Sequence, residues 1–242
     1  MRLLAFDTST DVLSLAVQNH SVLLARELAG GPKSSRVLLP ESLQLLQQLG
    51  LALQDLDAIV YGCGPGAFTG LRTSCAAAQG LAFGSHLSAV PVDSLLAIAE
   101  GARHAHGVEQ VVAVLDARMQ EVYAAPFRWL EAEQRWQREA DIQVMKPQDV
   151  QVPDGYVLAG NAFAVYPEAF AEYRAERLLH QLPQAEAMLR LAPGLIAAQG
   201  LQAPSSIAPL YIRNKVAQTT EERMRARQAL ELAEKSPAAL GD

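Results

Sequence analysis

The chain has 242 residues, half of them hydrophobic, which is enough apolar material for one large domain or two small ones. Its formal net charge of −6 argues against a free-standing nucleic-acid binder, because such proteins are usually basic over their contact face. The two cysteines, Cys63 and Cys75, are too few for a disulfide framework and lack the spacing of a zinc site. No apolar run reaches the roughly 20 residues of a membrane span, and the first residues lack a signal-peptide pattern, so we expect a cytoplasmic protein without a membrane segment.

The N-terminal segment has the pattern of three consecutive strands. An apolar run at 3–6 ends at Asp7, and alternating hydrophobic residues predict two more strands at 12–18 and 22–29. Because only short turns separate these strands, an antiparallel meander is favoured.

A helical pattern replaces the strands after a Gly-Gly-Pro break. Leucines recur at helical spacing over residues 35–49, and Gly50 is placed to end this first helix. Pro40 falls early in the helix, where it either belongs to the first turn or kinks the chain. A buried strand is predicted at 56–64, and it runs into a glycine-rich turn.

Two further helices are predicted after this turn. The second spans 70–83 with Thr69 as its N-cap, and the third runs to Glu100 with Asp93 or Ser94 as its cap. A short apolar stretch between them reads as a strand. Strands and helices in this order indicate an α/β domain.

The second half of the chain repeats the opening of the first. Residues 111–127 again read as strand, aspartate, turn and strand, so that Asp116 matches Asp7 and 121–125 match 12–16. A repeated supersecondary unit is the simplest origin of this likeness. We therefore expect two similar domains.

The polar segment at 101–107 is predicted to be the boundary between these domains. An N-terminal domain would then span 1–103 and a C-terminal domain 104–215. The charged tail at 216–242 opens with the spacing of a capping box and reads as a solvated helix.

Two turns are candidates for binding an anion or a nucleotide. Asp7, Thr8 and Ser9 place a carboxylate and hydroxyls after a buried strand, where phosphate or Mg²⁺ is often bound. An ordinary hairpin, with Asp7 bonding the amides of its own turn, explains the same residues. The sequence leaves both interpretations open.

The glycine-rich turn at 64–70 is the sharper of the two signals. A strand, a glycine-rich turn and a helix N-terminus together bind anions, because free amides and the helix dipole point at the ligand. The candidate residues are Gly64, Gly66, Thr69 and Arg72. No lysine follows the glycines, so this is not a P-loop, and the glycines can equally serve a close-packed turn.

The first two helices carry more apolar surface than one buried face requires. In the first helix, Leu38, Leu45 and Leu49 cannot easily share a face with Leu39, Leu43 and Leu46. In the second, Ala76, Ala77 and Gly80 form a strip of small residues that admits a neighbouring helix. Such surplus surface indicates a partner site, or else the two helices cover each other.

The sequence offers little that is typical of catalysis or metal binding. No histidine pair has the helical spacing of a zinc protease, and no nucleophile elbow is present. Neither cysteine has the context of an activated nucleophile. We therefore expect no catalytic residue, no bound metal and no cofactor.

Four sequence blocks, in order, resemble the TsaB (YeaZ) family. They are LLAFDTST at 3–10, LDAIVYGCGPGAFTGLRTSCAAAQGLA at 56–82, VLDARMQEVYAA at 114–125 and PLYIRN at 209–214. The resemblance implies the α/β fold of actin, Hsp70 and sugar kinases (the ASKHA fold), with two related domains that each hold a mixed sheet and flanking helices. It also implies a non-catalytic partner of the transferase TsaD, which with the ATPase TsaE supports N6-threonylcarbamoylation of adenosine 37 in tRNAs that read ANN codons.

The resemblance further implies that the first two helices bind the TsaD-type subunit. From their surplus apolar surface we expect the same helices to form a homodimer when that subunit is absent. The residues expected at this interface are Leu38, Ser42, Leu45, Leu49, Thr73, Ala76, Ala77, Gly80 and Phe83. Contact with tRNA is expected only through the complex. TsaD carries a histidine metal pair in its first helix, whereas this chain has no histidine there.

Two other functions fit some of these residues. Asp7 and the turn at 64–70 would suit a stand-alone ATP-dependent phosphotransferase of the same fold, although the chain is short for such a kinase. A metallopeptidase of the M22 type ranks lower, because the expected ligands are missing.

Overall fold

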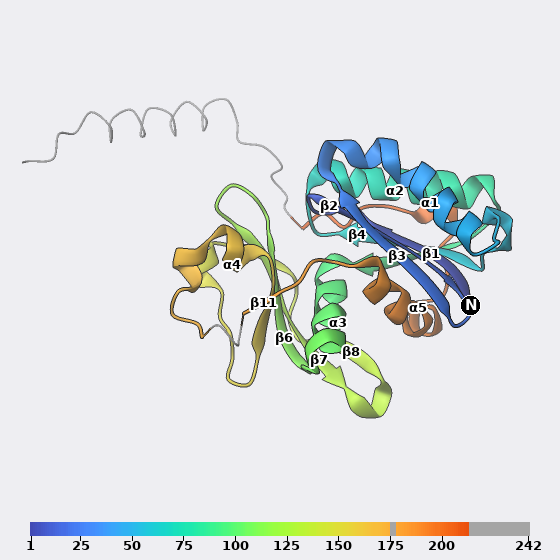
Figure 1. Cartoon of the computed structure of the whole chain (residues 1–242). Coiled ribbons are helices and arrows are strands. Elements are labelled where there is room, and N and C mark those ends of the chain that lie inside the picture. The colour runs from blue at the N-terminus through green and yellow to red at the C-terminus, as the bar shows by residue number, and fades with distance from the viewer. Residues whose placement is uncertain (175–177, 213–242) are drawn as a thin grey trace, which may run out of the picture. The chain divides into compact units, whose positions relative to one another are not determined.

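The computed structural model describes residues 1–174 and 178–212 (Figure 1). The predicted tail at 216–242 lies outside these residues. None of the helices in the described part of the chain is both long and apolar enough to span a membrane.

The first half forms a five-stranded sheet in the order β3-β2-β1-β4-β5. The strands are β1 (Arg2–Asp7), β2 (Val12–Asn19), β3 (Val22–Ala29), β4 (Ala58–Gly64) and β5 (Ala89–Asp93). The first three strands pair antiparallel, which confirms the predicted meander, whereas β4 and β5 run parallel to β1. The carboxyl ends of β1, β4 and β5 therefore meet at one edge of the sheet.

Three helices accompany this sheet: α1 (Ser34–Gln48), α2 (Phe68–Gly84) and α3 (Ser94–His106). The predicted caps hold at two of them. Gly50 ends α1 in a left-handed conformation with φ of 67°, and the Leu51 amide bonds the Leu46 carbonyl in a Schellman motif. Asp93 caps α3 by accepting hydrogen bonds from the next turn.

The structure corrects two details of these helices and decides between the two places that the sequence left open for Pro40. Thr69 is not the N-cap of α2, because the helix begins at Phe68 and Ala67 precedes it as the cap. Pro40 lies inside α1 rather than in its first turn. The segment 101–107, predicted as a boundary loop, is mostly helical, because Ala102 is buried in the core and α3 ends only at Gly107.

The second half repeats the strand arrangement of the first. Its order is β11-β10-β6-β7-β8, with β9 paired to β7. The strands are β6 (Gln110–Asp116), β7 (Val122–Leu130), β8 (Arg135–Arg138), β9 (Gln143–Met145), β10 (Val157–Gly160) and β11 (Leu178–His180). As β1 does in the first sheet, β6 pairs antiparallel with the next strand and parallel with a later one. The repeat read from the sequence is thus confirmed, and the fold is of the ASKHA class.

The helices of the two halves differ more than the strands. In the second half the segment before β10 holds only a short 3-10 turn, and α4 (Ala162–Val165) has four residues. The longer α5 (Ala185–Gln199) follows β11, and its Met188 and Leu189 pack against Leu3 and Val60 of the first sheet. Conversely, the main core of the second sheet includes residues of α3. The last helix of each half therefore packs in the core of the other half: α3 against the second sheet and α5 against the first.

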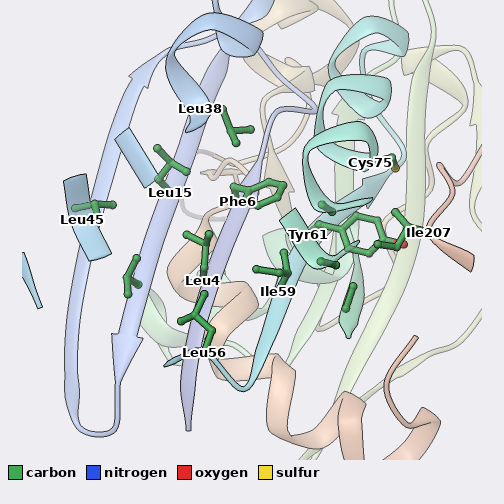
Figure 2. Close-up of a cluster of buried hydrophobic side chains, with 14 of the residues drawn as sticks. Leu4, Phe6, Leu15, Leu38, Leu45, Leu56, Ile59, Tyr61, Cys75 and Ile207 are labelled. Atoms are coloured by element: carbon green, nitrogen blue, oxygen red, sulfur yellow. The ribbon is translucent and has the colours of Figure 1, made fainter. Parts of the chain in front are cut away.

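The main core of the first half lies between its sheet and α1–α2 (Figure 2). Leu38 and Leu45 point from α1 toward the sheet, where they join Phe6 and Tyr61. This arrangement fixes which side of α1 and α2 faces inward and which remains on the surface.

The last described residues return to the first half. Residues 200–212, named here the closing segment, run beside α2 (Figure 1, orange to red). Gln202 forms an antiparallel bridge with Ala89 of β5, and the Leu210 amide donates to the Cys63 carbonyl at 2.8 Å. The buried side chain of Ile207 adds to the core.

Candidate functional site

The turn that follows β1 is buried and held by its own hydrogen bonds. Oδ1 of Asp7 accepts from the Ser9 amide at 2.7 Å and from the Ser9 hydroxyl at 2.6 Å. Oδ2 lies 3.4 Å from the Ser94 hydroxyl at the start of α3. Burial raises the pKa of Asp7 to about 6, although these hydrogen bonds act to lower it.

Three glycines allow the chain to close onto this turn. A Cβ atom on Gly62 would lie 1.9 Å from Oδ2 of Asp7, and one on Gly70 would lie 1.9 Å from the Thr8 carbonyl oxygen. A Cβ on Gly66 would lie 2.5 Å from that of Ser9. The Thr8 hydroxyl also donates to the Gly70 carbonyl at 2.7 Å. These glycines therefore serve close packing of the two predicted anion turns against each other.

A second turn follows β6, at the position that the repeat assigns. Oδ1 of Asp116 accepts from the Arg118 amide at 2.8 Å, as Asp7 accepts from Ser9, and also from the Tyr166 hydroxyl at 2.8 Å. The guanidinium of Arg118 contacts Oδ2 of Asp116 at 3.2 Å and Oδ2 of Asp11 at 2.9 Å. Arg118 thus links the turns of the two halves.

The two turns border a small pocket of about 80 Å³. It is lined by Ser9, Thr10, Asp11, Gly66, Ala67, Leu115, Asp116, Ala117, Arg118, Asn161 and Val165. Of the predicted anion-site residues, Ser9 and Gly66 reach this pocket, whereas Asp7, Thr8, Gly64, Thr69 and Arg72 are not among the lining residues. Arg72 instead lies on the exposed side of α2, where its Nε bonds the Tyr211 hydroxyl.

Sequence reasoning missed Arg118, Asn161 and Tyr166. Asn161 accepts a hydrogen bond from the Asp116 amide at 2.9 Å and so fixes the end of β6. The alignment of Asp116 with Asp7 was the available signal, because residues two positions after each aspartate close equivalent turns. Tyr166 comes from a distant segment that only the fold brings to this turn.

The structure also changes the predicted partner surface. Leu38 and Leu45 are 2% exposed and Ser42 is fully buried, so these three cannot contact a partner without rearrangement of α1. They face the sheet because positions 38, 42 and 45 repeat at helical spacing. The buried Ser42 hydroxyl donates a hydrogen bond to the Leu38 carbonyl. The prediction that Leu38, Ser42 and Leu45 belong to the partner surface of α1 is therefore wrong.

The apolar residues that do face outward lie on both helices. On α1, Leu39 is 45% exposed and Leu43 is 44% exposed, and on α2 Phe83 is 77% exposed. On α2, Ala76 and Gly80 are exposed as well, whereas Leu49, Thr73 and Ala77 are half-buried. We call Leu39, Leu43, Ala76, Gly80 and Phe83 the outer face.

Comparison with known proteins decides the family. The chain is 36% identical over 227 residues to the Escherichia coli (strain K12) "tRNA threonylcarbamoyladenosine biosynthesis protein TsaB", covering 90% of this chain and 96% of that relative. The Haemophilus influenzae protein of the same name is 35% identical, with coverage of 89% and 95%. The chain belongs to the TsaB family.

A sequence model of the wider family and a solved structure agree with this assignment. The family described as "TsaD: tRNA N6-adenosine threonylcarbamoyltransferase" matches residues 31–220. YeaZ from Pseudomonas aeruginosa is similar with a TM-score of 0.79 at 33% identity, covering 87% of this chain and 99% of that one. The TsaB likeness therefore concerns both halves of the described chain.

The described part of this TsaB-family chain has no group of three histidine, cysteine or acidic side chains that could hold a metal ion. Burial raises the pKa of Cys75 to about 11 and that of Cys63 further still. Both thiols therefore stay protonated near neutral pH and are poor nucleophiles.

Proposed function

We propose that the chain is a non-catalytic subunit of a cytoplasmic complex that attaches threonylcarbamoyl to N6 of adenosine 37 in tRNAs that read ANN codons. It binds a TsaD-type transferase through the outer face of α1 and α2, and it acts together with a TsaE-type ATPase. Contact with tRNA is made through the complex. The names of the E. coli and H. influenzae relatives support the pathway.

The observation that carries the proposal is the contrast between an exposed helical face and a pocket of only about 80 Å³ between the two turns. Leu39, Leu43 and Phe83 expose apolar surface whose burial is worth roughly 1.5–3 kcal/mol for a full side chain. The exposed small residues Ala76 and Gly80 of α2 let a partner helix approach closely. This combination favours docking of a helical surface on the outer face.

The small pocket between the turns at Asp7 and Asp116 argues against a nucleotide site there. Ligand pockets usually measure about 300–1,000 Å³, whereas the pocket between the two turns is about 80 Å³. Asp7 is the best candidate for a catalytic carboxylate, but it is buried and bonded within its own turn. These features disfavour the alternative of a stand-alone phosphotransferase, and calorimetry with ATP and Mg²⁺ should give no binding heat.

A reconstituted reaction tests the proposal. The purified chain is mixed with a TsaD-type transferase, a TsaE-type ATPase, tRNA and threonylcarbamoyl-adenylate, and each component is omitted in turn. We expect the modified nucleoside to disappear when this chain is omitted, and the chain alone to modify no tRNA. Full modification without this chain would contradict the proposal.

A surface variant links that result to the outer face. Phe83→Glu should abolish the modification that depends on this chain, because it places a charge in the apolar interface. Phe83 is already 77% exposed, so the variant should unfold at the same denaturant concentration as the wild type. In the absence of the transferase, we expect the wild type to sediment as a homodimer and Phe83→Glu to sediment as a monomer.

A further inference from the structure

Three side chains from two distant segments stack at one end of α2. The guanidinium carbon of Arg72 lies 3.9 Å from the centre of the Phe68 ring. The Tyr211 ring stacks on Phe68 with 5.4 Å between centroids, and its hydroxyl accepts a hydrogen bond from Nε of Arg72 at 3.1 Å. Arg72 and Tyr211 are 139 positions apart in the chain, so this group exists only in the folded state.

Tyr211 is held in place independently of Arg72. The closing segment is fixed by the bond from the Leu210 amide to Cys63 and by the bond from Gln79 to the Pro204 carbonyl at 3.3 Å. The buried Ile207 anchors the same segment in the core. Arg72 is therefore oriented by a residue whose own segment is anchored to the fold through other contacts.

This support leaves the end of the Arg72 side chain available. One face of the guanidinium covers Phe68 and Nε is bonded, which leaves the two terminal nitrogens for another group. Among the described residues no carboxylate lies within ion-pair distance of Arg72, whereas Arg2 pairs with Asp57 and Arg26 pairs with Glu41. Arg72 is therefore a charged, exposed and oriented donor that has no acidic partner within residues 1–174 and 178–212.

Arg72 also lies on the same stripe of α2 as the outer face. Positions 72, 76, 80 and 83 follow helical spacing, and all four are exposed. Arg72 therefore stands where the apolar outer face ends toward the N-terminus of α2. A polar rim beside an apolar centre is the usual composition of a protein interface, and arginine is enriched among its strongest contacts.

We propose that Arg72 binds an aspartate or glutamate of the TsaD-type partner and so fixes the register of that partner on α2. The inference rests on the proposed function, because it adds a polar anchor to the outer face. The planar guanidinium matches a carboxylate with two parallel hydrogen bonds. Its support by Phe68 and Tyr211 reduces the side-chain freedom that binding would otherwise remove.

A protein carboxylate fits this position better than a tRNA phosphate. Arg72 borders an apolar helical face, which suits a packed protein surface rather than a solvated nucleic-acid backbone. The chain as a whole carries a net charge of −6, which repels a polyanion but tolerates a single carboxylate at a local cation.

Isothermal titration of the full chain with the TsaD-type transferase tests the proposal. Arg72→Ala should raise Kd at least tenfold and reduce the dependence of Kd on salt. Arg72→Lys should raise Kd nearly as much, because lysine keeps the charge but not the fork. Tyr211→Phe should raise Kd about threefold, because it loses only the supporting hydroxyl. Arg103→Ala is the matched control, since Arg103 also stacks on a ring, Trp129, at 3.7 Å, and it should leave Kd unchanged.

The outcomes separate this inference from the proposed function. If the wild type does not bind the transferase, the proposed function fails. If Phe83→Glu abolishes binding while Arg72→Ala stays within twofold of the wild type, only the role of Arg72 is overturned. Wild-type Kd in Arg72→Lys would reject bidentate binding by the guanidinium and its support by Phe68 and Tyr211. Loss of tRNA crosslinking with an intact protein complex would assign Arg72 to the nucleic acid instead.

Discussion

Two glycines on the same helix show how differently the two sides of α2 are used. Gly70 lies against the first turn, where a Cβ atom would come within 1.9 Å of the Thr8 carbonyl oxygen. Gly80 lies on the outer face, where a Cβ atom would meet nothing within 4 Å. One side of α2 packs directly on the turn at 7–9 at Gly70, whereas Ala76, Gly80 and Phe83 on the other side are exposed. The same residue type thus serves packing on one side of α2 and, in our proposal, recognition on the other.

The largest effect is expected at the packed glycine. Gly70→Val should lower the free energy of unfolding by about 4 kcal/mol, because the new side chain meets backbone atoms that cannot move aside. Gly80→Ala should instead raise it by about 0.5–1 kcal/mol, since alanine favours the helix and meets no neighbour. Urea denaturation of both variants measures the difference. Equal effects at the two positions would break the comparison.

The same contrast applies to two neighbouring leucines on α1. Leu38→Ala should cost about 3 kcal/mol of stability, because it leaves a cavity in the core. Leu39→Ala should change stability by less than about 0.5 kcal/mol, but it should weaken transferase binding roughly tenfold if the outer face is the docking surface. Denaturation and titration of both variants separate the two roles. Wild-type stability of Leu38→Ala would show that Leu38 does not face the core and that α1 is rotated about its axis.

The buried turn predicts a pH dependence. The pKa of Asp7 is raised from 3.8 to about 6 in the folded protein, so the folded state holds the proton more tightly than the unfolded state. The cost of ionising Asp7 is therefore absent near pH 4, grows as pH rises, and is complete above pH 6 or so. Asp7→Asn removes this cost and should raise the free energy of unfolding at pH 7 by about 2 kcal/mol relative to the wild type.

Denaturation of the wild type and Asp7→Asn between pH 4 and pH 8 checks this sign. Burial also raises the pKa of Asp93 to about 6, so only the difference between the two proteins isolates Asp7. That difference should grow with pH and level off near neutrality. A difference that stays constant over this range would remove the buried carboxylate from the account.

The smallest effect is expected at the ion pair between Arg118 and Asp11, which joins the turns of the two halves. Arg118 and Asp11 are 62% and 78% exposed, and such surface pairs contribute about 0.2–1 kcal/mol. Arg118→Ala also removes the contact with Asp116, and we expect it to lower stability by about 0.5 kcal/mol in total. It should not create ATP binding, because the pocket that Arg118 lines measures only about 80 Å³. Calorimetry with ATP and Mg²⁺ on the variant provides the check. Clear binding heat would show that Arg118 alone keeps the nucleotide out.

Much of the sheet architecture could be predicted from sequence, because strand periodicity and the repeated Asp-turn pattern are local signals. The match of Asp116 with Asp7 correctly indicated two equivalent turns. The inward face of α1 could not be predicted, since leucines occur on both sides and a buried serine, Ser42, lies among the core residues. The end of α3 was also missed, because the polar residues of its last turn hid the buried Ala102.

The candidate site was less predictable than the fold. The glycine-rich turn was recognised, but only the structure shows that Gly66 and Gly70 are used against Ser9 and Thr8. Arg72 was grouped with that turn because it is near in sequence, yet it points to the opposite side of α2 and meets Tyr211. Neighbours that come from distant segments leave no periodic signal, so their contacts emerge only from the tertiary structure.

The most direct test compares one charged substitution at two equally open helical glycines. Gly80 lies on the outer face and Gly194 lies on α5, and in both a Cβ atom would meet nothing within 4 Å. Titration with the TsaD-type transferase should show that Gly80→Arg loses binding while Gly194→Arg binds as the wild type does. Wild-type affinity of Gly80→Arg, in a protein that is folded as the wild type is, would contradict docking on the outer face.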